Sequence, residues 1–314
     1  MKIVALAGGV GGAKLAQGLA RSLDSDELSI IVNTGDDFEF LGLNISPDLD
    51  TVCYTLANLA NMVTGWGLEG DTFNFMEKIR QMGEPDWFRL GDCDLATHII
   101  RTHKLTKGET LTSITEELCK SWSIRHRILP MSDEPVRTMV DTVELGVMPF
   151  QEYFVKYQFE PAIKGISFEG IEKAKPTQPV LKSLELCDAV VICPSNPFVS
   201  IDPVLSLNGI KTILKEKFVI AVSPLIGNKA IKGPLAKMFI EMNIEPTVGA
   251  IADHYREFLD CLFIHDTDVN EMPLDKRSCI ISKATNILLP DIDSRMKLAA
   301  EIVEFIKENQ TKNK

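Results

Sequence analysis

The sequence predicts an α/β fold: a doubly wound, mostly parallel, Rossmann-like sheet with an inserted, mainly helical subdomain. Short apolar runs rich in valine and isoleucine end in polar residues, glycine or proline, which is typical of buried parallel strands. They cover residues 2–7, 28–32, 189–193, 218–222 and 261–264. Apolar residues at helical spacing lie between some of these runs, for example Leu15, Leu19 and Leu23. Strands that alternate with helices predict a parallel sheet covered on both faces.

The region 72–172 interrupts this alternation. It contains helix-like segments, turn-rich stretches and two of the three tryptophans. We therefore predict that residues 1–71 and 173–314 form the α/β core and that residues 72–172 form the inserted, mainly helical subdomain.

Composition and charge exclude several classes of protein. The chain has 314 residues, of which 45% are hydrophobic and 25% charged, as in an ordinary globular protein. Its net charge of −11 argues against a nucleic-acid partner, because such binding relies on lysine and arginine. The N-terminal apolar run is too short for a signal peptide, and no run is long enough to span a bilayer, so we expect a cytoplasmic protein without a membrane partner.

A glycine-rich segment, Gly8-Gly9-Val10-Gly11-Gly12-Ala13-Lys14, directly follows the first predicted strand. Glycines let a backbone turn sharply and approach an anion, and the amides that begin the next helix can bind a phosphate. The spacing matches neither the dinucleotide fingerprint nor the phosphate loop. The fingerprint needs a glycine or alanine at the position of Lys14, and the phosphate loop needs serine or threonine after a Gly-Lys pair. Glycines also serve tight packing of a strand on a helix. Four glycines in five residues favour phosphate binding.

Four aspartates follow the second predicted strand. Asp36 and Asp37 end the segment 33–37, and Asp48 and Asp50 lie at the start of a predicted helix. Ligands of open α/β sheets collect at the carboxyl ends of the strands, and carboxylates beside phosphates indicate magnesium. Two alternatives stay open: Asp48 or Asp50 caps the helix that begins near residue 51, and Asp36 with Asp37 forms a turn.

Two further segments carry candidate binding residues. The third predicted strand is followed by Ser195, Asn196 and Pro197, and the prolines at 194 and 197 prevent continuation as strand or helix. The side chains of Ser195 and Asn196 face the crevice at the carboxyl ends of the strands, or the segment forms only a rigid turn. Within the predicted insertion, Arg89 follows two aromatic residues, a combination that suits a flat ring with polar edges. The five histidines show no metal-ligand spacing, so we interpret them as surface or packing residues.

Six motifs cover residues 6–14, 33–37, 47–51, 135–138, 150–155 and 194–197. Together they resemble the 2-phospho-L-lactate transferase family, which builds a deazaflavin coenzyme, coenzyme F(420). The resemblance implies a Mg²⁺-dependent transfer of 2-phospho-L-lactate from lactyl-2-diphospho-5'-guanosine to the deazaflavin precursor Fo (7,8-didemethyl-8-hydroxy-5-deazariboflavin), with release of GMP. Related enzymes use an enolpyruvyl donor. Under this hypothesis the α/β core binds the nucleotide and residues 72–172 bind the acceptor.

The resemblance also implies roles for single residues. Asp50 and Arg89 would contact the deazaflavin, while the glycine-rich segment with Lys14 and the segment 195–197 would hold the guanosine diphosphate part. Asp36, Asp37 and Asp48 are the candidate metal ligands, and which of them binds the ion stays open. Asp50 or Asp37 would orient or deprotonate the attacking hydroxyl, which requires only hydrogen-bond reach.

Other hypotheses remain at this point. A nucleotidyltransferase that acts on a phosphorylated small molecule would release pyrophosphate from a nucleoside triphosphate. A dinucleotide-dependent oxidoreductase would share the fold but not the glycine spacing. A non-catalytic nucleotide-binding or deazaflavin-binding protein would hold its ligand without turnover. A homodimer is our expectation for the oligomeric state.

Overall fold

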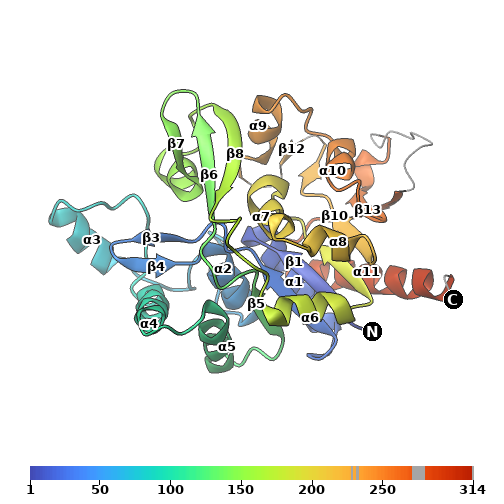
Figure 1. The fold of residues 1–314 in the computed structure, drawn as a ribbon, viewed down its shortest axis with the longest axis horizontal. Helices are drawn as coiled ribbons and strands as arrows, with labels where there is room; N and C mark the ends of the chain where they lie inside the picture. The colour runs from blue at the N-terminus through green and yellow to red at the C-terminus, as the bar shows by residue number, and fades with distance from the viewer. Residues whose placement is uncertain (228, 231–232, 271–279, 313–314) are drawn as a thin grey trace.

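The computed structural model describes residues 1–227, 229–230, 233–270 and 280–312. In these ranges seven strands form one sheet in the order β14-β13-β10-β9-β1-β2-β5, and every neighbouring pair is parallel (Figure 1). The doubly wound, Rossmann-like fold is thereby confirmed, and all five predicted strands belong to the sheet. The strands are β1 (Ile3–Ala7), β2 (Leu28–Val32), β5 (Arg127–Pro130), β9 (Ala189–Ile192), β10 (Phe218–Val222), β13 (Cys261–His265) and β14 (Ile281–Thr285).

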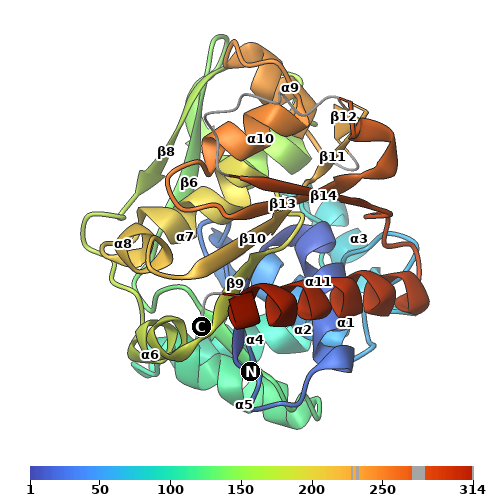
Figure 2. The ribbon, with the colours of Figure 1, turned by 90° about the vertical axis from the view of Figure 1, so that its right-hand side faces the viewer.

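Helices cover both faces of the sheet because its strands are apolar on both sides. In β1 all five residues are buried: Ile3, Ala5 and Ala7 contact one core, while Val4 and Leu6 contact the other. Figure 2 shows α1 and α11 side by side on the first face. That face carries α1 (Gly9–Ser22), α2 (Pro47–Leu56), α5 (Leu111–Ser121) and α11 (Ile292–Lys312), and the other carries α6 (Gln178–Leu186), α7 (Asp202–Ser206), α8 (Ile210–Leu214), α9 (Leu235–Glu241) and α10 (Val248–His254).

The strand order reverses beside β1. From β1 the chain builds outward through β2 and β5, whereas its second half starts again at β9 on the other side and builds through β10, β13 and β14. Ala5 of β1 is paired with Ile30 of β2 and with Val191 of β9. A reversal of this kind opens a crevice at the carboxyl ends of the two central strands, where α/β proteins bind their ligands. The predicted site residues that follow β1 and β9 lie at this switch point in the strand order.

The region 72–172 differs from the prediction of one mainly helical insertion. Its first half contains α3 (Asn74–Gln81), α4 (Asp94–Thr106) and α5, but β5 then returns to the main sheet as the neighbour of β2. The second half forms a separate antiparallel sheet in the order β7-β6-β8, which is the upper part of Figure 1. Its strands are β6 (Arg137–Thr142), β7 (Gly146–Pro149) and β8 (Ile163–Glu169), with the helical turn η1 (Glu152–Lys156) between the last two. The helical description therefore holds only before residue 127.

A small aromatic cluster corrects the interpretation of the residues before Arg89. Trp87 lies 5.2 Å from Phe40 and Phe88 lies 4.8 Å from Phe38, measured between ring centroids. Both phenylalanine partners belong to the hairpin formed by β3 (Phe38–Phe40) and β4 (Leu43–Ile45). The aromatic pair that we predicted to suit a flat ligand packs instead against this hairpin.

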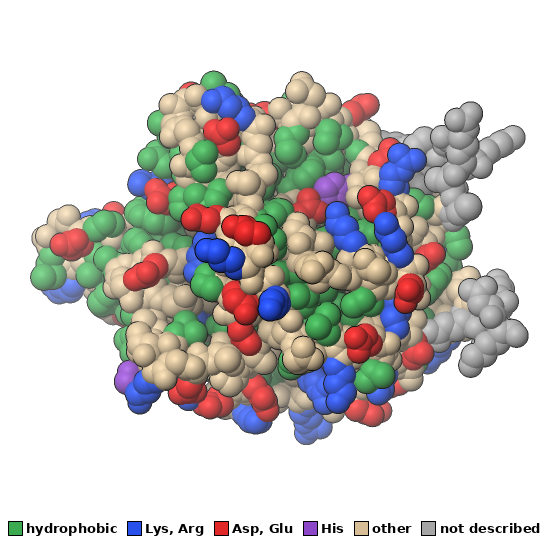
Figure 3. All heavy atoms as spheres, viewed as in Figure 1, with side chains coloured by type: hydrophobic (Ala, Val, Ile, Leu, Met, Phe, Trp, Pro, Cys, Tyr) green, Lys and Arg blue, Asp and Glu red, His purple; other side chains and the backbone are tan. Residues whose placement is uncertain are grey.

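The remaining described elements are short. They are the hairpin β11 (Leu225–Ile226) with β12 (Lys229–Ala230) and the helical turns η2 (Pro197–Ile201) and η3 (Asp266–Asp268). On the face drawn in Figure 3, basic and acidic side chains are interspersed. Within the described ranges, no helix combines the length and the apolar character needed to cross a bilayer.

Candidate active site

Ser195 joins the two loops that follow β1 and β9 at the switch point. Its hydroxyl accepts a hydrogen bond from the backbone N–H of Gly8 at 3.1 Å and donates one to the carbonyl oxygen of Gly8 at 2.8 Å. Gly8 is the first residue after β1, and Ser195 lies three residues after β9. The structure thus brings together two segments that sequence reasoning placed in one crevice. The hydroxyl itself is engaged by the protein backbone.

Close packing explains three of the four glycines. A Cβ atom at Gly8 would overlap the carboxylate of Asp48, one at Gly11 the carbonyl oxygen of Pro194, and one at Gly12 the hydroxyl of Ser195. Gly9 has a φ of +62°, a left-handed conformation that other residues rarely adopt. The packing alternative therefore accounts for the glycine spacing, and phosphate binding by this segment stays a prediction.

The side chain of Asp48, from α2, contacts the start of α1, where we predicted a phosphate. Its Oδ1 accepts a hydrogen bond from the N–H of Gly9 at 2.6 Å, and its Oδ2 accepts one from Nδ2 of Asn33 at 2.9 Å. Because α2 begins at Pro47 with Ser46 as its N-cap residue, Asp48 and Asp50 lie inside the first turn, and the capping alternative is wrong. Burial raises the pKa of Asp48 to about 6, against the opposing effect of the bonds from Asn33 and Gly9.

Asp36 and Asp37 form the predicted turn, in which the N–H of Asp37 donates to the carbonyl oxygen of Thr34 at 3.2 Å. Both side chains are buried, and the Oδ1 atom of each has no hydrogen-bond partner. Burial raises the pKa of Asp37 to about 7, although Arg137 and a hydrogen bond from Ser46 oppose the shift. Burial also raises the pKa of Asp36 well above its usual value, with repulsion from Asp48 adding to it.

The oxygen atoms near Asp36 fit a hard divalent cation in part. The hydroxyls of Thr34 and Thr138, like the Oδ1 atoms of Asp36 and Asp37, are buried without a hydrogen-bond partner. Among the described residues, no three histidine, cysteine, aspartate or glutamate side chains are arranged to hold a metal ion by themselves. Magnesium commonly uses one or two carboxylates together with substrate phosphates. A site completed by a bound diphosphate therefore agrees with both observations.

Asp50 is paired with an arginine that sequence reasoning missed. Nη1 of Arg101 lies 3.1 Å from Oδ2 of Asp50, and Nη2 contacts Oδ1. Both side chains are buried, so this is an internal ion pair between α2 and α4. The structure thus pairs Asp50 with Arg101, whereas the exposed Arg89 lies over the ring of Phe73, 4.0 Å from its centroid.

Behind this pair lies a buried polar network that contains His98. Its Nδ1 is 3.7 Å from Oδ2 of Asp50, and its Nε2 is 3.3 Å from Oδ2 of Asp94. Tyr54 donates a hydrogen bond of 2.5 Å to Oδ1 of Asp94. His98 is therefore part of a buried polar network, which corrects its interpretation as a surface or packing residue. The spacing of Asp94, His98 and Arg101 along one helix face was the available signal.

Three further residues predicted to contact the nucleotide are Asn196, Pro197 and Lys14. Oδ1 of Asn196 accepts a hydrogen bond from the N–H of Phe198 at 3.0 Å and so begins the turn η2, whose first residue is the buried Pro197. The rigid-turn alternative thus describes the local role of this segment. Lys14 is partly buried in α1.

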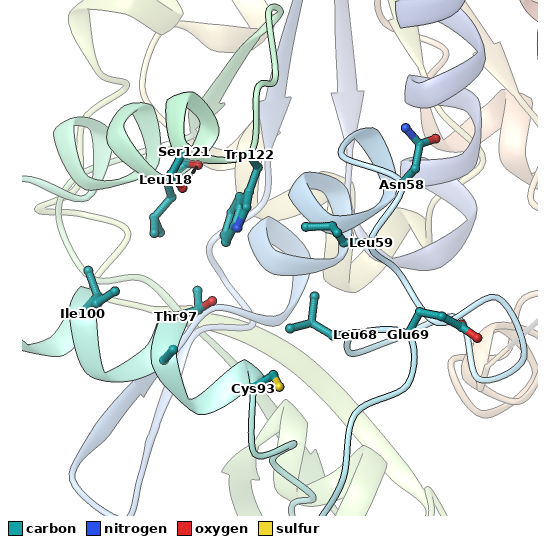
Figure 4. A pocket seen from close by; sticks show the side chains of 11 residues that line it. Asn58, Leu59, Leu68, Glu69, Cys93, Thr97, Ile100, Leu118, Ser121 and Trp122 are labelled. Atoms are coloured by element: carbon teal, nitrogen blue, oxygen red, sulfur yellow. Dashed lines mark hydrogen bonds between the residues drawn. The ribbon is translucent and has the colours of Figure 1, made fainter.

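A hollow of about 340 Å³ lies elsewhere, between the end of α2, α4 and α5. Trp122, Leu118, Ile100, Leu59 and Leu68 form its apolar lining, as Figure 4 shows. None of the predicted site residues lines it. The aspartate cluster at the switch point, not this hollow, is therefore the candidate active site.

A family model described as 2-phospho-L-lactate transferase CofD matches residues 3–309. The chain belongs to the 2-phospho-L-lactate transferase CofD family. Over 97% of both chains it is 39% identical to the 2-phospho-L-lactate transferase of Methanosarcina acetivorans. A phosphoenolpyruvate transferase of Streptomyces coelicolor is 35% identical over 98% of this chain and 99% of that relative. The resemblance stated from the motifs is confirmed, and CofD family membership supports a transferase.

A solved structure supports the fold of the CofD family member. A upf0052 family protein from Bacillus halodurans is similar with a TM-score of 0.61, covering 96% of this chain and 98% of the other. Since the two sequences are only 15% identical, this likeness concerns the fold alone.

Proposed function

We propose that the protein transfers the 2-phospho-L-lactate group from lactyl-2-diphospho-5'-guanosine to the deazaflavin Fo and releases GMP. The observation that carries the proposal is the cluster of four buried aspartates at the switch point of a chain in this family. The reaction joins the phosphorus of the phospholactyl group to a ribityl hydroxyl oxygen of Fo and breaks its bond to the oxygen that leaves with GMP. In phosphoryl-group chemistry of this kind, positioning and charge neutralisation dominate.

The four carboxylates have two kinds of surroundings, although the adjacent Asp36 and Asp37 also repel one another. Asp36 and Asp48 repel one another and lie beside Asn33, next to the start of α1. Asp37 and Asp50 repel one another and lie beside Ser46 and Arg101. We assign the first pair to the donor diphosphate and the second pair to the acceptor.

Asp36 is the best-placed magnesium ligand, because its Oδ1 is buried and has no partner, whereas both oxygens of Asp48 accept hydrogen bonds. Bound Mg²⁺ would neutralise the negative charge of the diphosphate and of the leaving GMP. The N–H of Gly9 already donates to Asp48, but the next backbone amides in the first turn of α1, which have no partner within the helix, would donate to the same diphosphate.

Asp37 is better suited than Asp50 to receive the proton of the attacking hydroxyl. Its Oδ1 has no hydrogen-bond partner, and its pKa is raised to about 7, close to that of an effective general base at neutral pH. Both oxygens of Asp50 instead accept from Arg101, which holds it as an oriented carboxylate. We therefore assign Asp50 to binding of the acceptor, together with Arg89.

The test is a reaction of the purified protein with Fo, Mg²⁺ and either the lactyl or the enolpyruvyl donor. We expect GMP and the phospholactyl deazaflavin, identified by chromatography and mass spectrometry, with the lactyl donor preferred. Absence of GMP with both donors, or release of pyrophosphate from GTP and a sugar phosphate, would contradict the proposal. A cytoplasmic homodimer is part of the same proposal, and light scattering on the eluting protein measures its mass.

A further inference from the structure

Arg101 holds Asp50, one of the two aspartates that we assign to the acceptor. It lies in the middle of α4, is only 2% exposed, and reaches both carboxylate oxygens of Asp50 with its two terminal nitrogens. The same Nη1 atom lies 3.3 Å from the carbonyl oxygen of Asn44 in β4. One guanidinium thus contacts both α2 and the strand that precedes it.

The contact with β4 extends toward Asp37. The N–H of Asn44 donates to the hydroxyl of Thr102, the neighbour of Arg101, at 2.7 Å. Two residues after Asn44, the hydroxyl of Ser46 donates to Oδ2 of Asp37 at 2.8 Å. Helix α4 therefore fixes the backbone that presents Ser46 to Asp37, in addition to holding Asp50.

The guanidinium is itself held from behind. His98, one turn earlier on the same helix, places Nδ1 3.3 Å from Nη1 of Arg101, and its Nε2 lies 3.3 Å from Oδ2 of Asp94. The two terminal nitrogens of the planar guanidinium form a fork that fixes the Asp50 carboxylate in one orientation, whereas a lysine ammonium would contact it as a point charge. Without Arg101, a buried carboxylate would rotate or take up a proton.

We propose that Arg101 is a positioning residue for the acceptor: its fork fixes Asp50 and, through the β4–α2 connection, the Ser46 contact to Asp37. The proposal rests on the proposed function, because it names a residue that acts on the acceptor through Asp50. Arg101 belongs to none of the motifs that carried the family resemblance, and it does not contact the donor-side pair in the described structure.

The experiment compares Arg101→Met and Arg101→Lys with Arg295→Met as a matched control. Arg295 is also 2% exposed, but it lies in α11 and contacts a neutral side chain, Oε1 of Gln17 at 2.5 Å. Thermal unfolding of each variant measures the general effect of removing a buried arginine. The KM values for donor and acceptor are then determined separately, with binding of Fo measured by its fluorescence.

We expect Arg101→Met to raise the KM and Kd for Fo about 30-fold and the KM for the donor less than about threefold. Arg101→Lys should recover part of the loss, and Arg295→Met should change neither constant. The double variant Asp50→Asn/Arg101→Met should regain stability, since no buried charge is left unpaired, without regaining affinity for Fo.

Equal effects of Arg101→Met and Arg295→Met on the Fo constants would overturn the inference and leave the proposed function intact. A loss by Arg101→Met that falls equally on donor and acceptor would also overturn it. A wild-type protein that does not bind Fo would overturn the proposed function and the inference with it.

Discussion

Each aspartate of the site is buried, and burial of a carboxylate disfavours its charged form. The pKa of Asp37 is therefore raised from 3.8 to about 7, despite the nearby Arg137 and Ser46. The folded state binds this proton more tightly than the unfolded state does. The contribution of protonated Asp37 to the free energy of unfolding is fully present below about pH 4 and is lost as the pH rises through about 7. Ionisation of Asp37 above about pH 7 therefore lowers the stability of the folded state.

The variant Asp37→Asn tests this conclusion. We expect its free energy of unfolding at pH 8 to exceed that of the wild type by about 2 kcal/mol, because the amide cannot ionise. The difference should vanish near pH 4, and turnover at pH 8 should fall at least about 100-fold. Urea unfolding at both pH values, with the exposed Asp253→Asn as control, measures the effect. A variant less stable than the wild type at pH 8 would show that burial is not the dominant influence on Asp37.

Sequence reasoning located the aspartates but not their partners. The four carboxylates were predictable because they follow a strand whose carboxyl end borders a crevice. Arg101 was not, because it lies 51 residues after Asp50, and only the fold brings the two together. The glycine-rich segment was found, yet the atoms that occupy the missing Cβ positions come from Asp48 and from the loop after β9.

At the scale of elements, strands with strong apolar patterns were predicted and weaker ones were missed. The five predicted strands are buried on both faces of the sheet. The edge strand β5 has only two aliphatic residues before its proline, and the other edge strand, β14, is mostly exposed. Edge strands need less apolar surface, so their sequences carry less signal. The antiparallel sheet β7-β6-β8 was not predicted, because most residues of β7 and β8 are exposed or half-buried and their apolar pattern is weak.

The start of α1 offers a test at this scale. Alanine normally favours a helix over glycine by about 1 kcal/mol. A methyl group at position 11 would nevertheless overlap the carbonyl oxygen of Pro194, a backbone atom that cannot rotate away. We therefore expect Gly11→Ala to lower the free energy of unfolding by about 2 kcal/mol in the absence of nucleotide. Gly165→Ala, at an open position in β8 where a Cβ meets no atom within 4 Å, serves as the control in urea unfolding. If Gly11→Ala were neutral without nucleotide but lost affinity for GDP, phosphate binding would be the main role of this glycine.

For the molecule as a whole, the fold and the metal requirement should be separable. Two large apolar cores on opposite faces of one sheet hold the elements together, and the proposed magnesium ligands lie at the crevice rather than within those cores. Chelation by EDTA should therefore abolish turnover and leave the unfolding temperature of the free protein unchanged.

Mg²⁺ and GDP added together should raise the unfolding temperature more than the sum of their separate effects, because each would neutralise charge that opposes binding of the other. Differential scanning calorimetry measures both effects, with Asp36→Asn as the variant that should lose the joint stabilisation. Cooperative unfolding on chelation alone would contradict this view, since the ion would then belong to the structure and not to the reaction.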